Sequence, residues 1–308
     1  MQDILVIGSG IAGLAAARAC HAAGRDVLVI DKGRVPGGRC ATRKSRDGWQ
    51  FDHGCAIVDG GAAVLAETVA DARATGVLAA WGSIGAPLVG VPGMADWPAW
   101  LARDLSLRQG VEVSAISRIP GGWRAETEGG PIDAVRVALT VPAPQALRLI
   151  GPDHALTDAA ASVEMAPILT LMAAFSPVPH PGFEVRRTPL DPQGSVIWDG
   201  GKPDRPHAGA WVHHAGAEAS ETYLEETKEA IAEALLPDLC DLLGVRRRDA
   251  VYVAGHRWRY AHARRPLGQP CLVDPSGTFA AGGDWCLGTS VAHAWESGEA
   301  VARSLLAA

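Results

Sequence analysis

The feature that most constrains this fold is an apolar run that ends in a glycine-rich turn near the start of the chain. Residues 4–7 read Ile-Leu-Val-Ile, which is typical of a strand buried on both faces of a parallel sheet. The turn follows directly and reads GSGIAG at residues 8–13. A helix is then predicted from Ile11 to Ala23, and a second buried strand over residues 27–30. The first 31 residues therefore predict a β-α-β unit.

A G-x-G-x-x-G motif between a strand and a helix is typical of dinucleotide-binding proteins. Gly8 permits the tight turn, Gly10 lets the backbone approach a pyrophosphate, and Gly13 allows close packing of helix and strand. The first turn of the helix offers free N–H groups to phosphates. Asp31 ends the second strand, where a carboxylate can accept hydrogen bonds from ribose hydroxyls. These features predict a dinucleotide site, and the alternative is a turn with a purely structural role.

Two further motifs could complete such a site. The sequence GGR at residues 37–39 offers two glycines and a guanidinium, so Arg39 could clamp a pyrophosphate, the alternative being a solvated basic loop. Near the other end, GGDW at residues 282–285 follows an apolar strand, and Asp284 could bind the hydroxyls of an extended polyol chain. A final helix is predicted from about Ser290, and its N-terminus could face an electron-rich ring. The alternative is that this motif makes only a turn and a helix cap.

The composition excludes several other classes of protein. A length of 308 residues suggests about two domains, and 48% hydrophobic with 20% charged residues describes an ordinary globular chain. A net charge of −6 provides no basic surface for nucleic acid. The six cysteines form no C-x-x-C pair, so we predict no metal site and no disulfide ladder. Reduced thiols favour a cytoplasmic protein.

The apolar stretch near the N-terminus differs from targeting and membrane segments. Residues 4–17 contain three glycines and follow no basic region. They therefore predict neither a signal peptide nor a membrane-spanning helix, and we expect no membrane partner.

The order of the motifs resembles that of the FAD-dependent amine oxidase superfamily, and more closely that of its bacterial renalase-like proteins. The similar sequences are GGR at 37–39, GVPGM at 90–94, PAPQA at 142–146, HRWRYA at 256–261 and GDWCL at 283–287. The resemblance spans nearly the whole chain. It implies an α/β fold with a Rossmann-like FAD-binding domain of the p-hydroxybenzoate hydroxylase type. A mostly antiparallel α+β substrate domain is expected as an insertion.

The resemblance also implies where the domains and the cofactor contacts lie. The FAD-binding domain is expected at residues 1–60, 90–150 and 251–308, and the substrate domain at residues 61–89 and 151–250. By position, the residues expected to bind FAD are Gly8, Gly10, Ile11, Ala12, Gly13, Asp31, Lys32, Gly38, Arg39, Gly54, Ile116, Gly283, Asp284 and Val291.

The activity that the resemblance implies is a two-electron oxidation. A substrate hydride passes to the flavin N5, and dioxygen reoxidises the flavin to give hydrogen peroxide. For renalases the implied substrates are the 2- and 6-dihydro isomers of NAD(P)H, which are returned to NAD(P)+. One segment departs from the family. After Gly54 the bacterial renalases typically have Ala-Gln-Tyr-Phe, whereas this chain has Cys-Ala-Ile-Val at residues 55–58, so an aromatic and an amide side chain are missing.

A group of rings near the C-terminus is the candidate for substrate positioning. His256, Trp258 and Tyr260 alternate along a predicted strand and therefore share one face. Together with Trp285 they could stack on a flat nicotinamide and hydrogen-bond it, and no obligatory side-chain base is expected. The alternative is that both tryptophans belong to the core and that His256 satisfies a backbone carbonyl.

Two other functions stay open at this point. The first keeps FAD but oxidises an amine or a carbon-chain compound, as other superfamily members do. Many amine oxidases place a lysine near N5, and Lys202 is the candidate here, because the other three lysines lie in or near the cofactor loop or on an amphipathic helix. The second is a flavin- or nucleotide-binding module without turnover.

Overall fold

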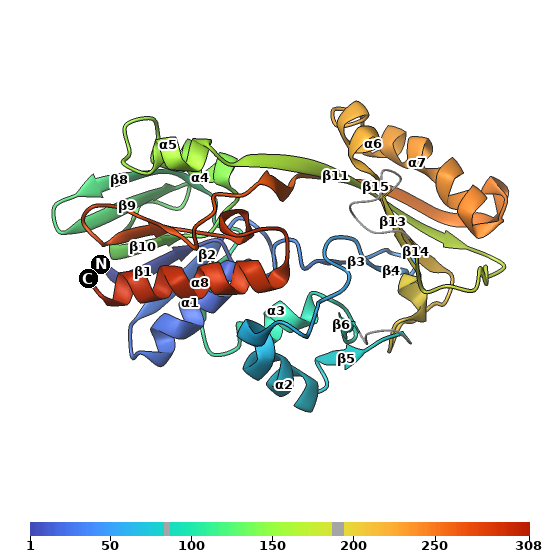
Figure 1. Ribbon diagram of the computed structural model, residues 1–308, viewed down its shortest axis with the longest axis horizontal. Helices are drawn as coiled ribbons and strands as arrows, with labels where there is room; N and C mark the ends of the chain where they lie inside the picture. Colours follow the sequence, from blue (N-terminus) through green and yellow to red (C-terminus); the bar gives the residue numbers. More distant parts are fainter. Residues whose placement is uncertain (83–86, 187–193) are drawn as a thin grey trace.

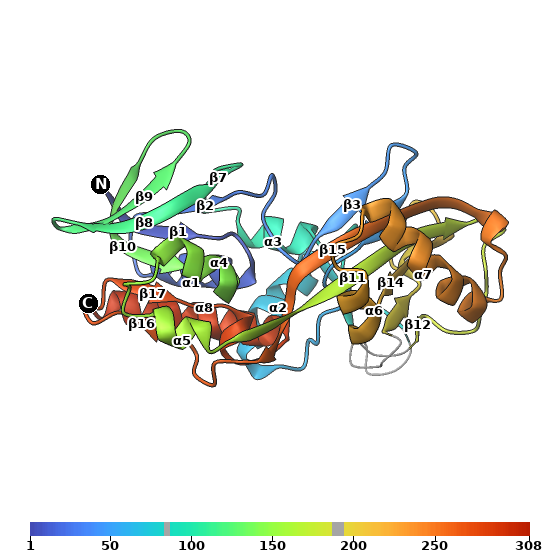
Figure 2. The same cartoon turned by 90° about the horizontal axis from the view of Figure 1, so that it is seen from above.

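The protein has two large β-sheets in separate lobes that are joined by two long strands, and the described residues also form two small two-stranded sheets (Figure 1). The computed structural model describes residues 1–82, 87–186 and 194–308. The lobe on the left of Figure 1 holds both termini and an eight-stranded sheet, and the other lobe holds a five-stranded sheet. The joining strands are β11 (Glu164–Phe175) and β15 (Ala250–Arg265), whose course is clearest in Figure 2. The predicted combination of a Rossmann-like domain with a mostly antiparallel second domain is confirmed.

The eight-stranded sheet is built around the strand that the sequence predicts to be buried. In β1, Val6 lies opposite Val29 of β2 and Ala138 of β10, and both neighbours are parallel to it. Residues 4–6 have no exposed surface, because both faces of the strand are covered. The strand order is β16-β17-β10-β1-β2-β7, with β8 and β9 added beside β10 as a meander. The bounds are β1 (Gln2–Ile7), β2 (Val27–Asp31), β7 (Ser106–Gln109), β8 (Val113–Ile119), β9 (Gly122–Thr127), β10 (Ile132–Leu139), β16 (Leu272–Val273) and β17 (Phe279–Ala281).

Two helices from opposite ends of the chain cover one face of this sheet. They are α1 (Ile11–Ala22) and α8 (Val291–Leu306), and they lie side by side (Figure 1). Gly298 allows their close approach, since a Cβ at this position would come within 2.2 Å of the carbonyl oxygen of Ala12. The first and last segments of the chain therefore form one layer, as the predicted split FAD-binding domain requires.

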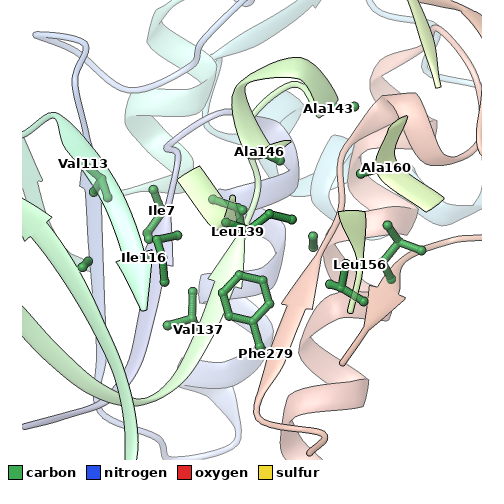
Figure 3. Close-up of a cluster of buried hydrophobic side chains, with 14 of the residues drawn as sticks. Ile7, Val113, Ile116, Val137, Leu139, Ala143, Ala146, Leu156, Ala160 and Phe279 are labelled. Carbon is green, nitrogen blue, oxygen red and sulfur yellow. The ribbon is translucent and has the colours of Figure 1, made fainter. Parts of the chain in front are cut away.

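The opposite face of the sheet is covered by the meander and by α4 (Ala143–Ile150) and α5 (Thr157–Ala161). Figure 3 shows the side chains of Ile7, Ile116 and Phe279 gathered in this cluster. The sheet thus buries apolar side chains on both faces, and this burial holds it between its two covering layers.

A third hydrophobic cluster lies between α1, α8 and the segment that follows the GGR motif at residues 37–39. The side chains of Leu14, Leu65, Trp97 and Trp295 meet there. Residues 61–89, expected in the substrate domain, thus pack in part against helices of the FAD-binding lobe. The elements of this region are β3 (Thr42–Lys44), β4 (Gln50–Asp52), η1 (Ala63–Leu65), α2 (Ala66–Ala74), β5 (Leu78–Ala80), β6 (Leu88–Gly90) and α3 (Asp96–Leu101).

The five-stranded sheet is antiparallel throughout, in the order β12-β13-β14-β11-β15. One face packs against α7 through residues such as Leu169, Trp211 and Leu235. The other face meets β4, where Phe51 packs on Met172. The bounds are β12 (Val185–Arg186), β13 (Ser195–Ile197), β14 (Ala210–His214), α6 (Ala217–Thr222) and α7 (Lys228–Leu243), with short 3₁₀ turns η2 (Asp199–Gly201), η3 (Arg247–Asp249) and η4 (Asp284–Cys286).

The position of β15 differs from the expected domain boundary. The expected FAD-binding segment begins at residue 251, but β15 pairs with β11 along nearly its whole length, so residues 250–265 belong to the five-stranded sheet. Within residues 1–82, 87–186 and 194–308, none of the helices has the length and apolar character needed to cross a membrane. In the same residues, no group of three or more His, Cys, Asp or Glu side chains could hold a metal ion.

Candidate functional site

The turn before α1 exposes backbone rather than side chains. Gly10 is the N-cap residue of α1, no side chain caps the helix, and its first turn contains no acidic residue. A Cβ at Gly10 would meet nothing within 4 Å, whereas a Cβ at Gly13 would lie 1.9 Å from the carbonyl oxygen of Gly8. Gly13 is thus required by packing, while Gly10 leaves the helix N-terminus and its N–H groups open to an anion.

Asp31 organises the loops at the carboxyl end of the sheet. Its two carboxylate oxygens accept hydrogen bonds from the backbone N–H groups of Ser9 and Gly33, both at 2.6 Å. Beside it on β7 lies Gln109, whose Nε2 donates to the Ser9 hydroxyl at 3.2 Å and whose buried Oε1 has no partner among the described residues. Sequence reasoning missed Gln109, although its place at the end of a parallel strand could have indicated it. Lys32 is exposed and lies 3.7 Å from Glu112.

The loop with the second glycine motif lies directly against the first. Gly37 donates its N–H to the carbonyl of Ser9 at 2.8 Å and forms a bridge with Gly10. Gly38 has a φ of +56°, and a Cβ there would meet only the Cα of Gly10, at 3.4 Å. The structure therefore brings the two glycine motifs together to form one backbone-lined cradle.

The two charged residues expected to contact the cofactor contact each other. Arg39 donates from Nη1 and Nη2 to the two carboxylate oxygens of Asp284 at 2.7 and 2.6 Å, and Nη1 also donates to the Ala261 carbonyl at 2.6 Å. Burial lowers the pKa of Arg39, but the carboxylate of Asp284 more than offsets this, so the pKa is raised. This bidentate pair connects the second motif to the last one.

The start of α8 is partly capped by its own side chains. Ser290 accepts a hydrogen bond from the N–H of His293 at 3.2 Å, and the His293 ring accepts one from the N–H of Ser290 at 3.3 Å. Gly283 donates its N–H to the Ser297 hydroxyl at 2.8 Å. Val291, the first residue of the helix, lies between the two residues of this capping box.

Three of the remaining expected FAD-binding residues have buried side chains. Ile11 and Ala12 begin α1 and are covered by the lobe. Ile116 lies on β8, and its side chain belongs to the hydrophobic cluster in Figure 3. Any contact of these residues with a cofactor would therefore involve their backbone.

A cluster of neutral rings lies beside the cradle. The rings of His53 and Trp258 stack with 5.2 Å between centroids, and His256 meets both rings edge-on, at 4.7 and 4.5 Å. The Trp258 indole donates to the His53 carbonyl at 2.9 Å. Gly54 allows this approach, since a Cβ there would lie 2.0 Å from the Arg39 carbonyl and 3.1 Å from the Trp258 ring. We call His53, His256 and Trp258 the ring cluster.

The histidines near this cluster are uncharged at neutral pH. Burial lowers the pKa of His53 to about 4 and the pKa of His256 to about 3. Burial also lowers the pKa of His214 to about 4, and the His214 ring lies 3.3 Å from the His53 carbonyl. The Nδ1 atom of His53, a residue only 8% exposed, has no partner among the described residues. Sequence reasoning missed His53, because nothing in its own segment indicates that β15 packs over it.

The other two residues proposed for substrate positioning have different surroundings. A register shift interrupts the pairing of β15 with β11 between Trp258 and His262, so Tyr260 lies within an irregular stretch of the strand. Trp285 has no exposed surface, and its indole donates to the Val141 carbonyl at 3.0 Å. Its ring belongs to the hydrophobic core, the alternative that the sequence left open.

Lys202 lies in a fully buried ionic cluster between the lobes. Its ammonium is 2.8 Å from the carboxylate of Asp52 and 2.5 Å from that of Asp199, and it donates to the Ala56 carbonyl at 2.9 Å. Arg205 also pairs with Asp52. Burial raises the pKa of Asp52, but Lys202 and Arg205 outweigh it and the pKa is lowered, whereas burial keeps the pKa of Asp199 raised. The four charges balance, and they join β4 to η2.

The residues around the cradle fit a flavin dinucleotide. The uncapped N-terminus of α1 and the open side of Gly10 suit a pyrophosphate, and Asp31 and the unpartnered Oε1 of Gln109 lie where ribose hydroxyls would be bound. The ring cluster lies at the far end, beyond Arg39 and Gly54. Motifs from both ends of the chain thus converge on one elongated site.

Comparison with known proteins agrees with this arrangement. Residues 6–71 match the family model of the NAD(P)-binding Rossmann-like domain, and residues 76–306 match that of the flavin containing amine oxidoreductases. An L-aspartate oxidase from Mycobacterium leprae is 34% identical over 128 residues. That match covers 42% of this chain and only 22% of the relative, so the chain matches about a fifth of its length.

Solved structures resemble the chain over its whole length. A protein assigned as a protoporphyrinogen oxidase from Exiguobacterium sp. 255-15 superposes with a TM-score of 0.73 at 16% identity, over 99% of this chain and 98% of that one. Putrescine oxidase bound to putrescine gives 0.72 at 14% identity, over 100% and 99%. At these identities the likeness concerns the fold. Since the second family model covers most of the chain, the protein belongs to the flavin containing amine oxidoreductase family, and its cofactor is FAD.

Proposed function

We propose that the protein is an oxidase that takes a hydride from the 2- or 6-dihydro isomers of NAD(P)H and returns them to NAD(P)+. When bound, FAD accepts the hydride at N5 and passes the electrons to dioxygen, which gives hydrogen peroxide. The observation that supports this substrate class is the ring cluster, an uncharged group of one buried and two half-buried rings beside the flavin cradle.

The ring cluster suits a flat and neutral heterocycle. Aromatic rings bind other rings by offset stacking or by edge contacts, and both geometries occur among His53, His256 and Trp258. The unpartnered Nδ1 of His53 could hydrogen-bond a carboxamide, which would satisfy a polar atom that is costly to leave buried. These rings would bind and orient the substrate and exclude water from it.

The charge state of the site also favours hydride loss from a neutral ring. Oxidising a dihydronicotinamide removes a hydride and leaves a ring cation, so no proton has to be taken from the substrate. Neutral histidines with pKa values of about 3 and 4 are consistent with a site that needs no base. The lysine considered for amine oxidation is unsuited to work near N5, because Lys202 is already held by Asp52 and Asp199.

An anaerobic titration tests the proposal directly. Mixing the purified yellow protein with 2- or 6-dihydro-NAD(P) should bleach the flavin absorbance, and admitting air should restore it with release of peroxide. Ordinary 4-dihydro-NAD(P)H is the matched control, and an alkyl amine tests the amine oxidase alternative. Bleaching by the amine but by neither isomer would overturn the proposal.

The pH profile offers a second, independent test. Since neither a dihydro-NAD isomer nor the ring cluster changes charge between pH 5 and 8, we expect kcat/KM for that isomer to be nearly flat over this range. An amine substrate must lose its proton before oxidation, so amine oxidation would accelerate steeply with rising pH. A steep rise with the dihydro isomers would contradict the proposed role of the neutral rings.

A single substitution tests the ring cluster itself. His256→Ala removes one ring and should raise KM about fivefold, since one ring contact contributes roughly 1 kcal/mol. The flavin content should stay unchanged, because His256 lies outside the cradle. His21→Ala, on the exposed end of α1, is the control and should leave KM unaltered. Equal KM values in both variants would exclude His256 from substrate binding.

A further inference from the structure

Two cysteines lie side by side in the wall of the flavin cradle. Cys40 follows Arg39 directly, and Cys55 follows Gly54. The N–H of Cys55 donates to the Arg39 carbonyl at 2.8 Å, so the two segments are in backbone contact immediately before the thiols. Both side chains pack in the same hydrophobic cluster, and the Cys55 thiol donates to the Ile57 carbonyl at 3.1 Å. Both residues belong to different motifs of the site, and the proposed function uses neither thiol.

The two thiols have unlike acidities. The neighbouring Cys40 side chain is the main reason that the pKa of Cys55 is lowered; burial opposes this, and the cations of Lys202 and Arg39 lower the pKa further. The neighbouring Cys55 side chain, together with burial, raises the pKa of Cys40 well above its usual value. Reactive dithiols typically combine one thiol of lowered pKa with a neighbouring thiol of raised pKa.

The other cysteines of the chain differ from this pair. Burial raises the pKa of Cys20 to about 11 and that of Cys286 to about 12, and it also raises the pKa of Cys240. Cys55 is only partly buried, whereas Cys40 behind it is nearly inaccessible. The more acidic thiol is therefore also the more accessible one, as expected for an attacking thiol with a resolving partner.

We propose that Cys40 and Cys55 form a redox-active dithiol that hydrogen peroxide converts to a disulfide. The Cys55 thiolate attacks one peroxide oxygen, the O–O bond breaks, and the products are a sulfenic acid on Cys55 and hydroxide, which takes up a proton to give water. The Cys40 thiol then attacks the sulfenic sulfur, so the S–S bond forms and a second water leaves. One peroxide is reduced by two electrons and the two thiols are oxidised by two electrons.

The peroxide has a local source if the function proposed above holds, because the oxidase would release it within the same lobe. The proposed disulfide would tie the loop after the second glycine motif to the segment after Gly54. Both segments line the cradle, so oxidation would fix the distance between them. The oxidation state of the dithiol would thus depend on how much peroxide the oxidase has released.

The test uses the purified holoprotein and added hydrogen peroxide, so it does not depend on any substrate. After treatment, unfolding and alkylation should modify four cysteines instead of six, the intact mass should fall by two hydrogen atoms, and digestion should yield a peptide linking Cys40 to Cys55. Reduction with a dithiol reagent should restore all six alkylations. Six alkylated cysteines after treatment, or a disulfide joining another pair, would overturn the proposal.

Single variants separate the roles of the two thiols. In Cys40→Ser, Cys55 should stop at the sulfenic acid, which dimedone labels, whereas Cys55→Ser should show no oxidation at Cys40. Cys271→Ser removes a partly exposed thiol elsewhere in the same lobe and should form the Cys40–Cys55 disulfide at the wild-type rate. Equal dimedone labelling of Cys40 and Cys55 would contradict the assignment of Cys55 as the attacking thiol. Because the mass measurement uses the wild-type protein, it remains decisive if a variant fails to fold.

Discussion

The two ends of the candidate site are built by different means. At the nucleotide end, the cradle consists of backbone from Gly10, Gly37 and Gly38, in short motifs that can be recognised within the sequence. At the ring end, His53 and Trp258 are side chains from strands far apart in the chain, brought together by the packing of β15 over β4. The part of the site that is made of backbone can therefore be predicted from local sequence motifs. The part that is made of side chains depends on how distant segments pack together.

The largest effect on stability is expected for the buried ionic cluster that joins β4 to η2 at the ring end. Lys202→Met leaves Asp52 and Asp199 with only one cation, and we expect a loss of about 3–5 kcal/mol in unfolding free energy. The double variant Lys202→Met with Asp199→Asn restores charge balance and should recover most of the lost unfolding free energy. Urea denaturation of both variants measures the difference. A loss below about 1 kcal/mol in the single variant would show that these charges are solvated.

The next effect separates two glycines of the nucleotide end. Gly13→Ala places a Cβ against the Gly8 carbonyl and should cost about 3 kcal/mol, because the strand and the helix must move apart. Gly10→Ala places its Cβ in open space, so the apoprotein should keep its stability within about 0.5 kcal/mol.

The affinity for FAD is the quantity that Gly10→Ala should change. Gly10→Ala should weaken FAD binding by at least about tenfold, because the methyl group takes space needed by a pyrophosphate. Thermal melts of apoprotein and equilibrium dialysis with FAD give the two quantities separately. If Gly10→Ala bound FAD as tightly as the wild type, the cradle would not lie at this turn.

The effect that is smallest near neutral pH concerns the histidines of the ring end. The folded pKa values of His53, His214 and His256 are about 4, 4 and 3, below the value of 6.5 for a free side chain. Below pH 6.5 the unfolded chain therefore takes up protons that the folded protein excludes, and stability falls as pH drops towards 4. Each histidine contributes at most about 1.4 kcal/mol per pH unit.

Replacing one histidine sharpens this prediction. His53→Phe should reduce the slope of unfolding free energy against pH by one proton between pH 6.5 and 4, as measured by urea denaturation at several pH values. His21→Phe, on the exposed surface of α1, should leave the slope unchanged. The carboxyl of Asp52 does not interfere, because its lowered pKa confines its effect to lower pH. An unchanged slope in His53→Phe would show that this ring is protonated in the folded protein.

Much of the nucleotide end could be predicted from the sequence. The buried run of β1, the start of α1 at Ile11 and the start of α8 after Ser290 were all indicated by local patterns, since glycines and caps act within a few residues. Arg39 and Asp284 were also recognised as members of the site. Their bidentate pairing was not, because 245 positions separate them and no local pattern relates them.

The ring end was only partly predicted, for physical reasons. His53 and the partners of Lys202 depend on how β4 meets the second sheet, and neither segment encodes that contact alone. The pairing of β15 with β11 shifts register beside Tyr260, and strand alternation cannot anticipate such a bulge. Trp285 was expected beside the substrate, and the structure buries it in the core.

The contact of Arg39 with Asp284 has a consequence for biosynthesis. A ribosome synthesises Arg39 long before Asp284, which lies 245 positions later, and α8, which covers α1, emerges later still. Until then the guanidinium of Arg39 lacks its carboxylate and the apolar side of α1 is exposed. We expect that a nascent chain cannot retain FAD until α8 has emerged. Messenger truncations that remove α8 should therefore yield colourless chains prone to aggregation, however complete their first glycine motif.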